Sequence, residues 1–239
     1  MGRVMAYELA RRQAEVVVRA PGRELPLRHV IGIGRNYAEH AREQGAAVPE
    51  YPVVFSKNPA ALCLDGEEIV VPPVCQEPPQ TDFEAELAVV IGVRARDVPR
   101  ERAGEVILGY ACANDVSARW WQKQGSGGQF YRGKSFDTFC PLGPRVVGAG
   151  FDPADARIRC RVNGVVMQDA RTSQVIFDVP TLVAELSRGT TLLPGTVILT
   201  GTPAGVGMSR NPPVFLAAGD VVEVEIDGLG VLRNRVRFQ

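Results

Sequence analysis

The sequence predicts a single α+β domain in which β-structure dominates. Residues 87–93 form an almost continuous apolar run with β-branched side chains, which is too short for a globular helix and is typical of a buried strand. Nearer the C-terminus, Asn163-Gly164 and Asp227-Gly228 each separate two valine-containing runs, which indicates β-hairpins. The helices that the pattern allows, such as 180–188, are short.

The composition is ordinary for a globular protein. The chain has 239 residues, of which 45% are apolar and 23% are charged, enough to build a core. Its 27 basic and 27 acidic residues cancel, so the charge gives no sign of a nucleic-acid surface or a basic membrane-binding face. Charges interrupt every apolar run of the N-terminus, unlike a signal peptide, and no apolar stretch approaches membrane-spanning length. We therefore expect a small-molecule partner, and neither nucleic acid nor a membrane.

The cysteines indicate reduced thiols and a cytoplasmic protein. They are odd in number, widely spaced and never arranged as Cys-x-x-Cys, which argues against a disulfide framework and against a zinc site. They are Cys63, Cys75, Cys112, Cys140 and Cys160. Because the sequence has two histidines, His29 and His40, a histidine-rich metal site is excluded and any metal must be held by oxygen.

The N-terminal part predicts a hairpin, a strand and a helix. Residues 1–28 are weakly patterned and predict an edge strand or hairpin, to which we assign no function. Residues 29–34 predict a strand ending in a Gly-x-Gly pair, but Tyr37 stands where a dinucleotide-binding loop needs its third glycine. Asn36 as N-cap and Gly45 as C′ residue predict a short helix between them.

His40 and Glu43 lie three residues apart on this predicted helix and share one face. At that spacing the carboxylate can orient or charge the imidazole. A surface ion pair is the commoner role of such a pair, and a catalytic dyad is the alternative that the helix alone leaves open.

Two carboxylates precede the buried strand. Side chains alternate between the faces of a strand, so Glu84 and Glu86 point the same way with Ala85 opposite. Like charges this close need a cation, a shared proton or water, so a metal site and a solvated strand end both remain open. The proline-rich connection 72–79 before them is stiff, which suits a fixed site.

Residues 109–125 predict a buried strand that ends at Asp115, then a helix capped by Ser117. An acid at a strand end is a candidate third oxygen ligand, and capping the helix is its alternative role. Arg119 and Gln122 share a face of this helix, where a guanidinium and an amide could hold a substrate carboxylate.

Two glycine-rich loops complete the candidate site. Residues 125–133 are long enough to form a mobile cover, and they lead to Lys134, which is either a solvated charge or an electrophile aimed into a cleft. Residues 200–207 follow a buried strand and offer backbone N–H groups and the Thr202 hydroxyl to an anion.

Five blocks, taken together, carry a family resemblance. They are Gly34-Arg35-Asn36-Tyr37-Ala38-Glu39-His40, Glu84-x-Glu86, Asn114-Asp115-Val116-Ser117-Ala118-Arg119, Gly133-Lys134-Ser135-Phe136-Asp137 and Leu199-Thr200-Gly201-Thr202-Pro203. In this order they resemble the fumarylacetoacetate hydrolase family. The resemblance implies a mixed β-sandwich roll with short helices, a catalytic domain over residues 29–239 after a short extension of residues 1–28, and a homodimer.

The same resemblance implies a role for each candidate residue. Mg²⁺ or Mn²⁺ would be held by Glu84, Glu86 and Asp115. Catalysis would fall to the dyad of His40 and Glu43 on a lid helix and to the electrophilic Lys134, and substrate contacts to Arg119, Gln122 and Thr202. Trp120 departs from the family pattern, since many relatives have an acid after the arginine.

These residues predict a Mg²⁺- or Mn²⁺-dependent enzyme that acts on 2-oxo or 2,4-dioxo acids through an enolate, in the catabolism of aromatic compounds. Our leading hypothesis is hydrolysis of a C–C bond in an acylpyruvate-like substrate such as fumarylpyruvate. The alternative is isomerisation, tautomerisation or decarboxylation of a compound such as 2-hydroxyhepta-2,4-diene-1,7-dioate or oxaloacetate, and residues 211–230 resemble the oxaloacetate tautomerase-like and sugar-derived diketo-acid branches. A hypothesis of another class is a metal-stabilised ligand-binding protein without turnover.

Overall fold

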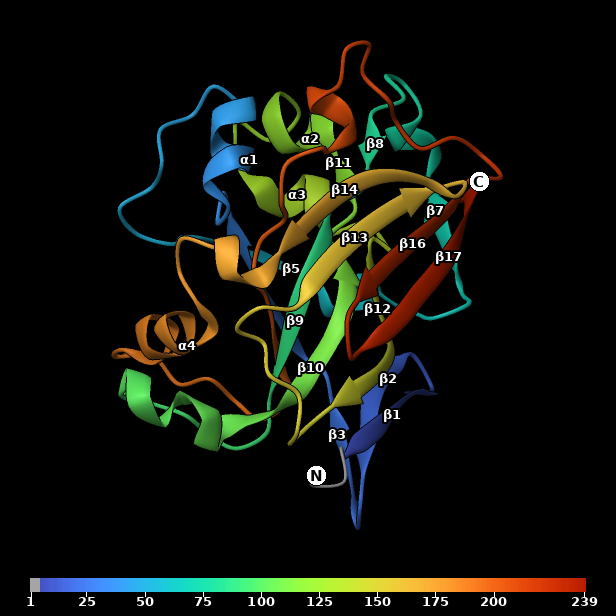
Figure 1. Cartoon of the computed structure of the whole chain (residues 1–239). Helices are drawn as coiled ribbons and strands as arrows, with labels where there is room; N and C mark the ends of the chain where they lie inside the picture. Colours follow the sequence, from blue (N-terminus) through green and yellow to red (C-terminus); the bar gives the residue numbers. More distant parts are fainter. Residues whose placement is uncertain (1–4) are drawn as a thin grey trace.

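The computed structural model describes residues 5–239, most of which lie in strands or in the turns between them (Figure 1). The strands are β1 (Ala6–Arg12), β2 (Glu15–Ala20), β3 (Arg23–Pro26), β4 (His29–Gly34), β5 (Val53–Lys57), β6 (Leu62–Leu64), β7 (Glu68–Val71), β8 (Thr81–Asp82), β9 (Ala85–Ile91), β10 (Ile107–Asn114), β11 (Ser117–Ala118), β12 (Cys140–Val147), β13 (Arg157–Val162), β14 (Val165–Arg171), β15 (Thr196–Leu199), β16 (Val221–Ile226) and β17 (Gly230–Phe238). The helices are short: α1 (Ala38–Glu43), α2 (Arg119–Lys123), α3 (Phe130–Lys134), α4 (Val179–Ser187) and the 3₁₀ turns η1 (Pro59–Ala61), η2 (Pro73–Cys75), η3 (Arg100–Val106), η4 (Thr172–Gln174) and η5 (Gly207–Ser209).

Two mixed sheets build the fold. The larger has ten strands in the order β3-β2-β1-β12-β10-β9-β15-β4-β5, with β6 paired to β12, and the smaller has the order β14-β13-β16-β17-β7. Most neighbours are antiparallel, but β15–β4, β6–β12 and β17–β7 are parallel pairs. This arrangement confirms the predicted β-dominated α+β class with short helices.

Strand β9 is buried on both faces, which explains its nearly continuous apolar sequence. On one face, Leu87 and Val89 belong to the core shared with the smaller sheet, represented by Val224. On the other face, Ala88 and Val90 pack in a second core with residues of β2 and β6. By alternation Glu86 belongs to the face of Ala88 and Val90.

The hairpin predictions are confirmed. Strands β13 and β14 flank Asn163-Gly164, whose φ angles of 51° and 79° are those of a type I′ turn. Strands β16 and β17 pair around Asp227-Gly228. At the N-terminus, β1 to β3 form the predicted hairpin at the edge of the larger sheet, and residues 1–4 of that segment lie outside the described part.

Two predicted helix caps are wrong. Helix α1 begins at Ala38 with Tyr37 as N-cap, whereas the side chain of Asn36 donates hydrogen bonds to the carbonyls of Phe177 and Thr200, at 2.9 and 2.7 Å. Ser117 lies in β11 rather than at a helix start, and its hydroxyl donates to the Asp115 carbonyl at 2.8 Å. In both cases a tertiary or local hydrogen bond takes the side chain that could have capped the helix.

The segment 125–133 is only partly a loop, because α3 begins at Phe130. Helix α3 packs closely on α2: a Cβ added at Gly133 would lie 2.4 Å from the backbone nitrogen of Gln122. Glycine here thus permits the close approach of the two helices that carry Arg119 and Lys134. In the part of the chain that the structure describes, no helix has the length and hydropathy to cross a membrane.

Candidate active site

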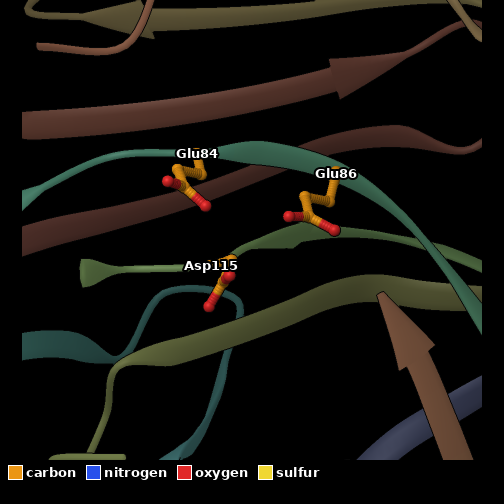
Figure 2. A group of neighbouring side chains, drawn as sticks. All are labelled: Glu84, Glu86 and Asp115. Carbon is orange, nitrogen blue, oxygen red and sulfur yellow. The ribbon is translucent and has the colours of Figure 1, made fainter. Parts of the chain in front are cut away.

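Three carboxylates meet where two paired strands end. Glu84 immediately precedes β9 and Asp115 immediately follows β10, and the register that pairs Ala113 with Glu86 brings them together. One oxygen from each carboxylate lies within 4.8 Å of the others, and all three residues are buried. Figure 2 shows the three side chains gathered in one place. The alternation that the sequence suggested is present, with Asp115 as the third member of the group.

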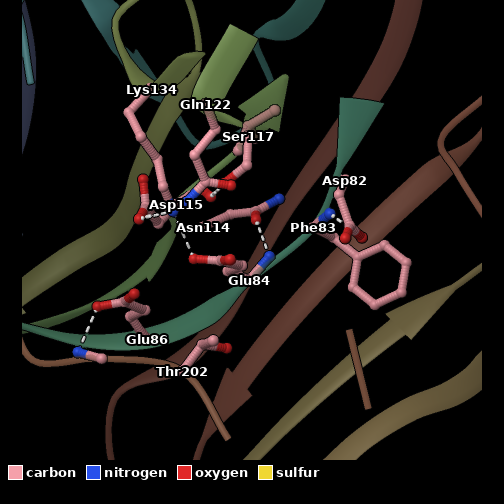
Figure 3. Close-up of polar contacts among 12 residues, drawn as sticks. Asp82, Phe83, Glu84, Glu86, Asn114, Asp115, Ser117, Gln122, Lys134 and Thr202 are labelled. Carbon is pink, nitrogen blue, oxygen red and sulfur yellow. Dashed lines mark hydrogen bonds and ion pairs between the residues drawn. The ribbon is translucent and has the colours of Figure 1, made fainter. Parts of the chain in front are cut away.

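Glu86 has the least compensated charge of the three. Its Oε2 accepts a hydrogen bond from the backbone N–H of Gly201 at 2.6 Å (Figure 3), and within residues 5–239 it forms no ion pair with a cation. Burial raises the pKa of Glu86 well above its usual range, and the nearby charges of Asp115 and Glu84 raise it further.

Glu84 is held by two cations. Its carboxylate contacts Lys134 Nζ and an Arg119 guanidinium nitrogen, each at 2.6 Å. Burial on its own would raise the pKa of Glu84, but Lys134 and Arg119 hold it below its usual range. Its backbone N–H donates to the side-chain oxygen of Asn114 at 2.9 Å, which fixes the start of β9 on the end of β10.

Lys134, the last residue of α3, bridges two of the three acids. Its ammonium donates to Glu84 Oε2 at 2.6 Å and to Asp115 Oδ2 at 2.5 Å (Figure 3). Burial lowers the pKa of Lys134, but the Asp115 and Glu84 carboxylates outweigh that effect and raise it. Lys134 is therefore a buried cation of the site and not a solvated charge.

Lys57, at the end of β5, was not among the residues predicted from the sequence. It is fully buried and donates to Asp115 Oδ1, to the Phe139 carbonyl at 2.7 Å and to the Val116 carbonyl at 3.3 Å. The signal was present in the sequence, because Lys57 ends a strand that begins with Val53 and a turn follows it at once. A lysine at such a position is either solvated or buried beside an acidic partner, and the local sequence does not show which acid that partner would be.

Arg119 lies behind Glu84 rather than along the pocket. Its guanidinium contacts Asp82 at 2.8 and 2.9 Å, Glu84 at 2.6 Å and the Gln122 side-chain oxygen at 2.9 Å. Asp82 also accepts backbone N–H bonds from Gly207 at 2.8 Å and Met208 at 3.0 Å. Asp82 was not predicted as part of the site, although Asp82, Glu84 and Glu86 form one alternating series.

His40 is buried and pairs with Glu43, whose side chain is partly exposed. His40 Nδ1 lies 2.6 Å from Glu43 Oε1, and the side-chain nitrogen of Gln44 lies 2.9 Å from His40 Nε2. A carboxylate only accepts, so Nδ1 carries the proton and Nε2 is the acceptor of the neutral ring. Glu43 Oε2 also accepts from the Gly205 N–H at 3.0 Å. Since His40 is 3% exposed, the imidazole of the pair is not a surface group, whereas Glu43 reaches the surface.

Thr202 is held by a residue that was not predicted from the sequence. Gln168, in β14, donates to the Thr202 hydroxyl and to the Pro203 carbonyl, both at 2.8 Å. Its side-chain oxygen accepts from the Ala85 N–H at 2.9 Å. Gln168 therefore ties the glycine-containing loop to the start of β9, and no local sequence signal marks it.

A small pocket brings most of the candidate residues together. Its volume is about 20 Å³, enough for about one water molecule. Its lining residues come from β4, α1, β5, α2, α3 and the segments next to β9 and β15, and they are Ile33, Gly34, Arg35, His40, Gln44, Phe55, Glu84, Glu86, Gln122, Phe130, Lys134 and Thr202. The predicted candidates Glu43, Asp115 and Arg119 stand behind this surface, each bonded to a residue that lines it.

The acidic group fits a hard divalent cation. The described part of the chain buries four carboxylates here, of Asp82, Glu84, Glu86 and Asp115, against three cations, of Lys57, Arg119 and Lys134. One carboxylate charge is left over, and oxygen donors of this kind suit Mg²⁺ or Mn²⁺. Glu84, Glu86 and Asp115 would hold the ion.

The comparison with known families decides the wider relationship. The pattern of the family described as fumarylacetoacetate (FAA) hydrolase C-terminal matches residues 29–237. The chain belongs to the fumarylacetoacetate hydrolase family. This confirms the resemblance seen in the five sequence blocks.

Members of the fumarylacetoacetate hydrolase family that resemble this chain carry several activities. A mitochondrial oxaloacetate tautomerase from Bos taurus is 48% identical over 209 residues, and the match spans 87% of this chain but only 66% of that protein. The solved 5-carboxymethyl-2-hydroxymuconate delta-isomerase from Mycobacterium smegmatis is 41% identical with a TM-score of 0.79, over 98% of this chain and 94% of that one. Fumarylpyruvate hydrolase from Pseudomonas aeruginosa, solved with Mn²⁺ and pyruvate, is 32% identical with a TM-score of 0.84, over 96% and 99%. The chain is an enzyme of this family.

The expected cytoplasmic location is contradicted. The oxaloacetate tautomerases from Bos taurus and Homo sapiens that resemble this chain are named as mitochondrial. The five cysteines are indeed free and buried. Free thiols argue for a reducing environment, but they do not say which reducing compartment holds the protein.

Proposed function

We propose that this fumarylacetoacetate hydrolase family member is a Mg²⁺- or Mn²⁺-dependent enzyme that moves a proton within a 2-oxo acid, as a tautomerase or isomerase of oxaloacetate-like substrates. The names of the tautomerase and isomerase relatives favour this alternative over our leading hypothesis of C–C bond hydrolysis. The homodimer, and the lack of nucleic-acid and membrane partners, stay predictions.

The observation that carries the proposal is the meeting of an acceptor nitrogen and a buried cation in one pocket. His40 Nε2 is the ring nitrogen that keeps a lone pair, because Glu43 holds the protonated Nδ1, and in the structure this lone pair accepts from the Gln44 side chain. Lys134 lines the same pocket and remains protonated beside Glu84. A base and a cation that can both reach a bound 2-oxo acid are what enolisation requires.

The residues suggest the following division of labour. His40 Nε2 would accept the proton that leaves C3, and the C–H electron pair would become the C2–C3 double bond while the carbonyl pair moves to oxygen. The ammonium of Lys134 would lie near that oxygen, and Glu43 would stabilise the imidazolium that forms. A divalent ion held by the three carboxylates would supply a Lewis acid for the 2-oxo acid end. Returning the proton to oxygen completes the tautomerisation.

Replacing His40 by alanine tests the proposal. We expect H40A to lose about 10²- to 10⁴-fold in turnover, the usual contribution of a positioned acid–base group, while it still binds Mn²⁺ as measured by titration calorimetry. The matched control is H29A, because His29 is the other histidine and lies exposed at the start of β4. Turnover by H40A at the wild-type rate would rule out the base.

The second candidate remains C–C bond hydrolysis, since the same His40–Glu43 pair could activate water and a fumarylpyruvate hydrolase shares the fold. Products identified by NMR from a panel of 2-oxo and 2,4-dioxo acids separate the two reactions. Tautomerisation leaves the carbon skeleton intact, whereas hydrolysis of an acylpyruvate, or decarboxylation of oxaloacetate, releases pyruvate. Absence of turnover on the whole panel would favour a ligand-binding protein.

A further inference from the structure

Arg35 is a cation that has no part in the proposed proton transfer. It follows β4 and lines the same pocket as His40 and Lys134. Its Nε is buried and has no hydrogen-bond partner within residues 5–239. Two of the carboxylates around the pocket are engaged elsewhere, as Glu43 pairs with His40 and Glu84 pairs with Lys134, and within residues 5–239 Glu86 forms no ion pair with Arg35. Arg35 therefore has hydrogen-bonding capacity that the described chain leaves unused.

The backbone of Arg35 is held in an uncommon conformation. Its φ of 57° lies in the left-handed region, which non-glycine residues adopt rarely and usually where neighbouring structure enforces it. The next residue, Asn36, supplies that structure: its side chain bonds the backbone of Phe177 and Thr200, and its carbonyl accepts the N–H of Ile176 at 2.7 Å. These contacts of Asn36 fix the backbone that directly follows Arg35.

A second cation lies near Arg35. Lys123, at the end of α2, is exposed, and burial of part of its chain together with the charges of Arg119 and Arg35 lowers its pKa. In the described structure Arg119 is paired with Asp82 and Glu84, but Arg35 and Lys123 are paired with no carboxylate. Two positive side chains without acidic partners, next to a pocket, attract an anion.

We propose that Arg35 binds the carboxylate of the substrate that lies remote from its 2-oxo acid end, and that it thereby selects dicarboxylic substrates. The inference rests on the proposed function, which places the 2-oxo acid end by Lys134 and the three carboxylates. A guanidinium offers two parallel N–H groups to a carboxylate, which a hydroxyl or methyl group at the same place would leave unpaired. Oxaloacetate is a short substrate of this class, and its C4 carboxylate is the remote group.

The test compares oxaloacetate with its 4-methyl ester, which differs only in the remote charge. Tautomerisation of both is followed by the ultraviolet absorbance of the enol, for the wild type, R35Q, R35K and a control, R145Q, which changes an exposed arginine outside the pocket. We expect the wild type to prefer the acid by about 10- to 100-fold in kcat/KM, the range of a hydrogen-bonded ion pair. The acid-to-ester ratio should fall to near one in R35Q and to an intermediate value in R35K, and should stay at the wild-type value in R145Q.

The outcomes separate this inference from the proposed function. If both compounds are turned over but the wild type shows an acid-to-ester ratio near one, or R35Q keeps the wild-type ratio, the role of Arg35 is overturned and the proposed function is not. No wild-type turnover of either compound overturns the proposed function, and this inference with it. If R35Q fails to fold, the ratios of the wild type and of R35K still decide.

Discussion

Lys57→Met removes one charge from the base of the site while it keeps an unbranched apolar side chain that is one atom shorter. The ammonium of Lys57 is fully buried and is shared among Asp115, the Phe139 carbonyl and the Val116 carbonyl. After the substitution these acceptors face a methyl group. Asp115 keeps Lys134, but its Oδ1 has no other donor within residues 5–239.

Breaking a buried ion pair by removing one partner costs about 3–5 kcal/mol, because the remaining charge stays desolvated. For a chain of this size 1 kcal/mol corresponds to about 2–4 °C in melting temperature. We therefore expect K57M to melt about 6–20 °C below the wild type. Part of this cost comes from the Lys57–Asp115 interaction itself. The loss of stability in the K57M/D115N double variant should therefore differ from the sum of the two single losses by about 1–3 kcal/mol.

Differential scanning calorimetry in EDTA measures the change without a contribution from bound metal. The control is K123M, because Lys123 is exposed and forms no ion pair in the described structure, so its stability should change by no more than about 0.5 kcal/mol. A melting temperature of K57M within about 2 °C of the wild type, or full additivity with D115N, would refute the reasoning from the buried pair.

Two further substitutions examine the metal site and the loop above it. Glu86→Gln removes the carboxylate that lacks a cation partner but keeps an oxygen for the Gly201 N–H, so in EDTA the variant should be at least as stable as the wild type. Mg²⁺ at 100 times the wild-type Kd should add about 2.7 kcal/mol to the stability of the wild type and much less to that of E86Q. An equal gain in stability for both proteins, measured by calorimetry, would contradict the assignment of Glu86 as a ligand. Gly207→Ala places a Cβ 1.8 Å from the Val214 carbonyl oxygen and 2.6 Å from Asp82 Oδ1, whereas the Cβ of the control Gly104→Ala meets nothing within 4 Å. G207A should therefore lose stability and turnover, while G104A should lose at most about 1 kcal/mol of stability. Similar melting curves for the two variants would show that the loop can move aside.

The sequence predicted best where a side chain's role depends on its own strand. Alternation placed Glu84 and Glu86 on one face, and the strand-end position marked Asp115 before any partner was known. The type I′ hairpin at Asn163-Gly164 was equally local, since the turn needs two residues that tolerate positive φ. In each case the determining interaction lies within a few residues of the chain.

Prediction failed where a distant segment competes for a side chain. Asn36 has the chemistry of an N-cap, yet its amide bonds carbonyls more than 140 residues away. Arg119 is engaged with Asp82 and Glu84, partners that the predicted helix did not indicate, and its contact with substrate stays a prediction. Lys57 and Gln168 were not predicted for the same reason, because the partners that define the role of each side chain, Asp115 and Thr202, lie far away in the sequence.

The parallel pair of β4 and β15 makes the site dependent on segments that are far apart in the chain. Residues 29–32 align with residues 196–199, and Gly201, just beyond, gives Glu86 its hydrogen bond. During synthesis, which proceeds from the N-terminus, the three acids exist long before that donor does. The side-chain amide of Asn36 likewise lacks one of its acceptors until the Thr200 carbonyl has been synthesised. A nascent chain can therefore carry all three acids without the backbone donor of Glu86, so a complete site would require synthesis to pass residue 201 and β15 to pair with β4.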